Sequence, residues 1–187
     1  MKPRHWQTLL QKLKITIKFN DLLLGTLWNA DLTKNAKLVA DIMNEARGEL
    51  ILEEFLRNIK DCWSNYELEL VRYQNKCRLI KGWEELFTQI DEHINNISSM
   101  KMSPYYKVFE EEIVPWDEKL QKIRLVFDTW IDVQRRYVYL EGIFFGSADI
   151  KSMLSTEFNK FKAIDTEFTT LMKKVTKKPV VLEVMSI

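Results

Sequence analysis

Side chains that commonly build metal and nucleophile sites are scarce in this sequence, which has two histidines and two cysteines. A metal site on His93 would need the neighbouring carboxylates Asp91 and Glu92 to complete its ligand set. We favour the simpler interpretation, a surface histidine. Cys62 stands beside Trp63 on an apolar stripe, so we predict a buried structural thiol rather than a nucleophile.

Phosphate-binding and acid–base patterns are equally sparse. The 5 glycines are scattered, and none precedes Lys-Ser or Lys-Thr, so we predict no P-loop for a nucleotide. Glu110 opens a run of three glutamates that could supply an acid pair, but adjacent residues on a helix point apart. A solvated face, or a docking patch for a basic partner, fits this run better. Arg135 and Arg136 could bind phosphate, but we favour pairing with acids across a helix interface.

Composition limits the class of protein that could position these groups. The 187 residues are 46% hydrophobic and 29% charged, which is typical of a globular chain and excludes disorder for the bulk of it. The net charge of +1 argues against nucleic-acid binding. Two cysteines form no disulfide framework, which indicates a reducing compartment. No run approaches 18 apolar residues, so we predict no membrane span.

The first half of the chain reads mainly as helix. Apolar residues recur at three- and four-residue steps over 38–46 and again over 52–66. Thr33 is a plausible N-cap for the first of these helices, and Gly48 could end or interrupt it.

The spacing then changes. Residues 67–81 have no helical phase, and Asn75-Lys76 could turn the chain, so we predict a β-hairpin there. Helical spacing returns over 83–97 and stops at Ser103-Pro104, because the residue before proline is pushed out of the α region.

A long apolar-periodic stretch follows over 116–144, and Pro115 either starts this helix or kinks a longer one. We predict a loop over Gly146–Asp149. Thr156 could cap a last long helix, which Lys177-Lys178-Pro179 ends. The remaining tail, 180–187, reads as the start of another element, and both ends of the chain look like cuts inside a larger protein.

These elements predict a fold that is mainly α: an elongated multi-helix bundle with one small β-hairpin at about 67–81. We expect residues 1–187 together to form one fragment with this helical fold, without internal repeats or linkers.

Several residue strings resemble the linker region of dynein heavy chains. The longest is WIDVQRRYVYLEGIFFGSADIK (Trp130–Lys151), whose second half looks like the cytoplasmic branch of the family. One departure is Tyr137, where the family usually has tryptophan; this keeps an aromatic ring with a polar end. Further matching strings are KPRHW (Lys2–Trp6), EFLRNIKDCW (Glu54–Trp63), NYELELVRYQNKCRLIKGWEELF (Asn65–Phe87) and MSPYYKVFEEE (Met102–Glu112).

The resemblance implies a mechanical role. Dynein heavy chains carry a tail, a linker and a ring of six AAA+ modules that bind ATP, and the linker bends and straightens over the ring to drive movement toward microtubule minus ends. By this resemblance the segment has no catalytic residues, cofactor or metal, and its partner is the AAA+ ring of the same heavy chain. Other dynein subunits and the microtubule would be reached only through the full complex, in the cytoplasm and on the cytoskeleton. We expect no nucleic acid or membrane partner.

Six residues are candidates for interface contacts or polar pairing between helices. Four stand on the stretch after Trp130, where Trp130, Val133 and Leu140 are better read as core. The Gly146–Asp149 loop and the break near Pro104 are candidate hinges. An alternative function is an independent helical adaptor that binds a partner protein. The six candidates are Gln134, Arg135, Arg136, Glu141, Tyr105 and Glu110.

Overall fold

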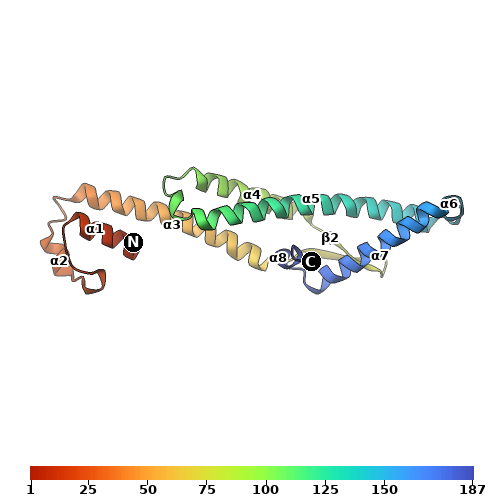
Figure 1. Ribbon diagram of the computed structural model, residues 1–187, viewed down its shortest axis with the longest axis horizontal. Coiled ribbons are helices and arrows are strands. Elements are labelled where there is room, and N and C mark those ends of the chain that lie inside the picture. The colour runs from red at the N-terminus through yellow and green to blue at the C-terminus, as the bar shows by residue number, and fades with distance from the viewer. The chain divides into compact units, whose positions relative to one another are not determined.

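The computed structural model describes residues 1–187, which fold into two compact units. Unit 1 contains residues 1–57 and 99–113, and unit 2 contains residues 58–98 and 114–187. Helices make up most of the chain, and the one sheet has two antiparallel strands (Figure 1). The predicted class, mainly α with one small β-hairpin, is therefore confirmed. None of the helices combines the length and the apolar character needed to cross a membrane.

Unit 1 is built around the N-terminal part of a long helix. The proline at the first position of α1 costs no hydrogen bond, because that N–H has no partner within a helix. His5 Nδ1 accepts from the backbone N–H of Lys2 at 2.9 Å, which closes the first turn of α1. The elements of unit 1 are α1 (Pro3–Lys12), η1 (Phe19–Asp21), α2 (Leu24–Asn29), the first part of α3 (Ala36–Asn65) and η2 (Tyr106–Val108).

Buried polar residues join α1 to α3. Glu49 of α3 and His5 of α1 are both almost fully buried, and His5 Nε2 lies 2.7 Å from Glu49 Oε2. Arg4 bonds the same carboxylate oxygen, and Lys2 pairs with Glu53 at 2.8 Å. Because the buried carboxylate has two partners, its burial is compensated. The basic start of the chain is therefore used to attach α1 to α3.

Helix α3 begins later than the sequence predicts. Thr33 lies in a turn three residues before Ala36, and its Oγ1 donates to Asp31 Oδ1 at 2.7 Å. The prediction of Thr33 as the N-cap is wrong, because a local turn centred on Asp31, which has a positive φ of 46°, precedes the helix.

Gly48 neither ends nor interrupts α3, which continues to Asn65. A Cβ built at position 48 would overlap the side-chain ring of Tyr105. The glycine is used for close packing and not as a helix terminator. Tyr105, one of the six candidates, is thus half-buried in unit 1 with its ring against the α3 backbone.

We expect Gly48→Ala to lower the free energy of unfolding by about 1 kcal/mol, because overpacking outweighs the gain in helix propensity of alanine over glycine. In a Tyr105→Ala background the same substitution should instead stabilise by about 1 kcal/mol, since only the propensity term remains. Urea unfolding followed by circular dichroism measures both. Stabilisation by Gly48→Ala in both backgrounds would contradict the packing role.

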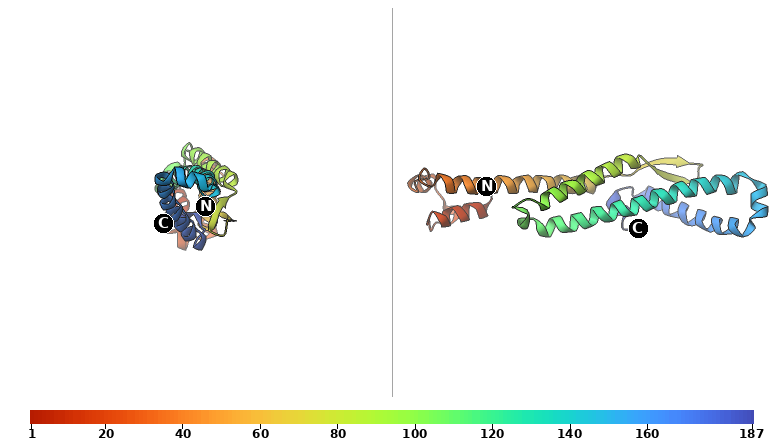
Figure 2. Two further views of the ribbon diagram at one scale, coloured as in Figure 1. Left: turned by 90° about the vertical axis from the view of Figure 1, so that its right-hand side faces the viewer. Right: turned by 90° about the horizontal axis from the view of Figure 1, so that it is seen from above.

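In unit 2, α-helices pack against the β1–β2 hairpin. In both Figure 1 and Figure 2, α7 folds back alongside the C-terminal part of α5, with the short α6 at the turn. The elements are the end of α3, β1 (Glu69–Tyr73), β2 (Cys77–Lys81), α4 (Trp83–Lys101), α5 (Glu110–Gly146), α6 (Ala148–Met153), α7 (Ser155–Lys177) and α8 (Val181–Val184).

The hairpin forms where the sequence predicts it, with Tyr73 opposite Cys77 at its closed end. Gln74 and Asn75 have φ values of 45° and 55°, and Lys76 N–H donates to Tyr73 C=O at 3.0 Å. Positive φ at both central residues is typical of a type I′ turn, whose twist suits a hairpin. The turn is therefore centred one residue earlier than predicted.

The core of unit 2 includes Trp63 and Phe127, both fully buried. His93 is 7% exposed, which makes the prediction of a surface histidine wrong. Its Nδ1 accepts from Trp63 Nε1 at 2.8 Å, so the histidine supplies the hydrogen bond that a buried indole requires. The neighbouring thiol of Cys62 is half-buried, and burial raises its pKa.

Three boundaries in the second half differ from expectation. Pro115 lies inside α5, which begins at Glu110, so the longer of the two predicted helices is the observed one. The predicted loop at Gly146–Asp149 shrinks to Ser147, whose Oγ accepts from Ile150 N–H and caps α6. Helix α7 begins at Ser155, so Thr156 is not its cap, and α7 ends at Lys177 as predicted.

The burial of one α5 residue also differs from the prediction. Val133 is 45% exposed, so its assignment to the core is wrong.

Candidate functional site: a polar junction between the hairpin, α5 and α7

Gln134 fastens the edge of the hairpin to α5. Its side-chain Nε2 donates to the C=O of Ile80, and its Oε1 accepts from the N–H of Ile80, both at 2.9 Å. Gln134 is 4% exposed and Ile80 is 1% exposed. The amide thus imitates a neighbouring β-strand and satisfies two buried backbone groups that water cannot reach.

Glu141 lies two helical turns further along α5 and holds the turn of the hairpin. One carboxylate oxygen, Oε1, pairs with Lys76 Nζ at 2.6 Å. The other, Oε2, accepts from Tyr73 Oη at 3.1 Å and from Gln74 Nε2 at 3.0 Å. Glu141 is only 2% exposed, so these three bonds replace the water that its carboxylate loses on burial.

Helix α7 joins this arrangement through Asp165. Tyr137 Oη donates to Asp165 Oδ1 at 2.6 Å, and Lys76 Nζ lies 3.8 Å from the same oxygen. The Tyr137 ring stacks on Phe168 with centroids 4.1 Å apart. Tyrosine at position 137 therefore uses both its ring and its hydroxyl to bind α5 to α7. We name the group Gln134, Tyr137, Glu141, Tyr73, Lys76 and Asp165 the hairpin junction.

The electrostatics of the junction follow from its burial. Burial acts to raise the pKa of Glu141, but the hydrogen bonds from Lys76, Tyr73 and Gln74 outweigh it and hold the pKa below its ordinary value. Burial, and then the hydrogen bond to Glu141, raise the pKa of Tyr73 to about 12. Burial and Asp165 likewise raise the pKa of Tyr137. At neutral pH the glutamate is therefore ionised and both tyrosines are neutral donors.

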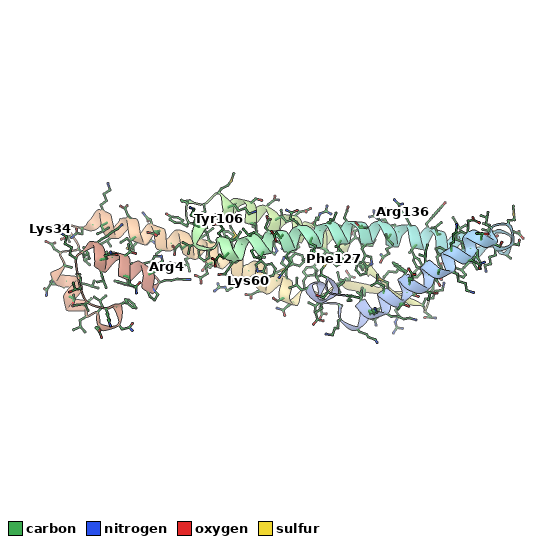
Figure 3. The ribbon with its side chains drawn as sticks, viewed as in Figure 1. Arg4, Lys34, Lys60, Tyr106, Phe127 and Arg136 are labelled. Carbon is green, nitrogen blue, oxygen red and sulfur yellow. The ribbon has the colours of Figure 1, made fainter.

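The six candidate residues do not form one site. Arg135 is exposed, with its guanidinium 5.4 Å from the centroid of the Trp83 ring, beside a hollow of about 390 Å³. Arg136 projects from α5 on the side opposite to Phe127 and pairs only with Asp132 of its own helix, at 2.9 Å (Figure 3). Tyr105 lies in unit 1, and Glu110 is the exposed first residue of α5.

Sequence reasoning missed four members of the junction, namely Tyr73, Lys76, Tyr137 and Asp165. A usable signal existed for the other two, because Gln134 and Glu141 are polar residues seven positions apart on an otherwise buried stripe of α5. Such positions need partners. We expected those partners on another helix, but the structure places most of them on the hairpin.

The arrangement holds the hairpin, α5 and α7 together. Its charged groups are bonded to one another, and the hairpin, α5 and α7 each contribute at least one of them. Buried, fully satisfied polar networks make packing specific and resist displacement of the elements that they join. The junction therefore resists displacement of the hairpin relative to α5 and α7.

The chain matches a short part of much longer known proteins. The family model described as Dynein heavy chain, N-terminal region 2 matches residues 1–187. The chain is 58% identical to a protein named "Dynein heavy chain, cytoplasmic" from Paramecium tetraurelia, 54% to one of that name from Drosophila melanogaster and 49% to one from Dictyostelium discoideum. Each match covers 100% of this chain but only 4% of the relative. The chain therefore belongs to the dynein heavy chain family, in its N-terminal region 2.

Proposed function

We propose that the chain is the mechanical linker, or lever, of a cytoplasmic dynein heavy chain, which bends and straightens over the AAA+ ring during the ATP-powered stroke along microtubules. The observation that carries the proposal is the match over the whole chain to heavy chains named cytoplasmic. In this proposal the segment acts in the cytoplasm on the cytoskeleton, and its partner is the ring of its own heavy chain.

In the same proposal, ATP is bound and hydrolysed by modules elsewhere in the heavy chain. This segment contributes no catalytic group and no cofactor. It would reach the microtubule and the other subunits only through the complete motor. The candidate contacts of Tyr105, Glu110, Arg135 and Arg136 with that ring are part of the proposal, and the exposure of Arg135, Arg136 and Glu110 is compatible with it.

The packing of unit 2 supports a lever. A lever carries force only if its elements do not slide past one another. The hairpin junction joins α7 and the hairpin to the 37-residue α5 by an ion pair and hydrogen bonds, and aromatic rings fill the α5–α7 contact. The ring pairs are Tyr137–Phe161, Tyr137–Phe168, Phe144–Phe158, Phe144–Phe161, Phe145–Phe158 and Phe145–Phe161.

The test separates force transmission from ATP turnover. In a complete motor carrying this segment, we expect Gln134→Leu to reduce microtubule gliding velocity several-fold while most of the microtubule-stimulated ATPase rate remains, because the hairpin is released from α5. Gln121→Leu is the matched control, since Gln121 is an exposed residue of the same helix. Velocity that stays equal to that of the control would contradict a lever role for the junction.

The alternative, an independent adaptor that binds a partner protein, is favoured by one observation. Leu23, Leu24 and Trp28 of unit 1 are 72%, 80% and 84% exposed, and Leu24 and Trp28 share one face of α2. An adaptor would act as the isolated 187-residue chain with a cellular partner of its own. Gliding velocity that is unaffected by deletion of the segment from a motor would favour this alternative.

A further inference from the structure

Two arginines of the hairpin face each other without a negative partner. Arg72 of β1 is directly opposite Arg78 of β2, and both are exposed. Like charges directly opposite on neighbouring strands destabilise a sheet. The hairpin's two other cations are paired, Lys76 with Glu141 and Lys81 with Glu69, whereas no ion pair or hydrogen bond is made by the side chains of Arg72 and Arg78. The pair is an uncompensated positive site.

The register also leaves one edge of the sheet open beside this pair. Because Ile80 uses its N–H and C=O to bond Gln134, these groups point away from β1. Leu70 is opposite Ile80, so the pair is not hydrogen-bonded, and the N–H and C=O of Leu70 point away from β2. By the same alternation, Arg72 also presents its N–H and C=O at the outer edge of β1.

Just before β1, the chain forms an isolated antiparallel bridge with the segment that follows α7. Leu68 N–H donates to Pro179 C=O at 2.9 Å, and Val181 N–H donates to Tyr66 C=O at 2.8 Å. These bonds form an antiparallel bridge between Glu67 and Val180. No further backbone bond is made along this edge by Leu70 or Arg72. The isolated bridge thus ends before Leu70, and Arg72 lies beyond it on the same edge.

We propose that the outer edge of β1 at Leu70 and Arg72 binds an acidic peptide in extended conformation, which adds to the sheet as a strand and places a carboxylate against Arg72 and Arg78. Backbone bonds along the edge supply a general affinity, and the arginine pair selects acidic side chains on one face of the peptide. The observations favour a peptide over other polyanions, because only a peptide satisfies the open backbone groups.

The probe is a fluorescein-labelled peptide of sequence Thr-Val-Glu-Val-Glu-Val-Thr, whose two glutamates share one face of a strand. Fluorescence anisotropy with the 187-residue chain should give saturable binding. Hydrogen exchange followed by NMR should show increased protection of the Leu70 and Arg72 amides. Replacing both glutamates of the peptide by lysine, or methylating the backbone nitrogens along one edge, should each weaken binding at least tenfold.

Arg78→Glu is the decisive variant. It should weaken binding at least tenfold, yet it should not unfold the hairpin, because Glu at position 78 makes a favourable cross-strand pair with Arg72. The urea midpoint of this variant should equal or exceed that of the wild type. Arg47→Glu, at an exposed arginine of α3 in unit 1, is the control for the same change of two charge units and should leave binding unchanged.

Two outcomes would overturn the proposal. One is equal affinity of Arg78→Glu and Arg47→Glu for the peptide. The other is binding of inorganic polyphosphate with the same affinity, together with no effect of backbone methylation, because the site would then recognise charge without strand pairing.

Discussion

Replacing Trp63 with alanine is expected to lower the free energy of unfolding by about 3–5 kcal/mol, the largest single-residue effect in unit 2. The side chain is fully buried, stacks on Tyr66 with ring centroids 5.2 Å apart and donates to His93. Alanine leaves a cavity and removes the donor at the same time. Trp63→Phe fills most of the space without the donor and should cost about 1–3 kcal/mol. Urea unfolding measures both variants.

The Trp63–His93 bond also predicts a pH dependence. Burial lowers the pKa of His93 from its ordinary value of 6.5, because a charged imidazole would be desolvated and could not accept from the indole. The unfolded chain therefore binds more protons near this pH, and stability should fall as the pH is lowered through 6.5. His93→Gln should flatten this dependence. An unchanged pH profile in that variant would show that His93 is not its source.

Loss of the Glu141 carboxylate is expected to have the second largest effect. Glu141→Gln should cost about 2 kcal/mol at pH 7, because the buried amide cannot neutralise Lys76 and directs an N–H₂ group toward donors. This loss of stability is small for a buried ion pair, because the Lys76 side chain is 33% exposed and water screens its charge. Urea unfolding tests it, and Glu118→Gln on the exposed face of the same helix is the control.

The pH profile gives this prediction a second readout. The folded-state pKa of Glu141 lies below the ordinary value of 4.5, so its contribution is complete above pH 4.5 and is lost as the pH falls through the folded-state pKa. The stability difference between the wild type and Glu141→Gln should therefore shrink in acid. A constant difference from pH 7 to pH 3 would contradict the assigned hydrogen bonds.

Local pattern was enough to predict most elements, because helical spacing and hairpin alternation report which face of a segment is buried. The helices over 52–66 and 83–97, and the hairpin near 67–81, lie where periodicity puts them. The predictions are wrong where a local signal is weak or is compatible with two different structures. Thr33 resembles an N-cap but belongs to a turn, and Gly48 resembles a terminator but provides space for Tyr105.

The candidate site shows the same division. Gln134 and Glu141 could be selected as buried polar residues on α5, since their spacing alone places them on the apolar stripe. Their partners could not be selected, because Ile80 offers only its backbone and Lys76 is one of 28 basic residues. Arg135 and Arg136 look equivalent to these two in sequence but face outward, one over Trp83 and one toward Asp132.

The helical class, the hairpin and the likeness to dynein heavy chains could all be predicted without coordinates, because they depend on periodicity and on long strings of residues. Which polar groups meet, in contrast, depends on how the elements pack in three dimensions. Contacts between residues as distant in the chain as Tyr73, Glu141 and Asp165 depend on how the hairpin and α7 are placed against α5. That placement results from the packing of whole faces, which no local pattern encodes.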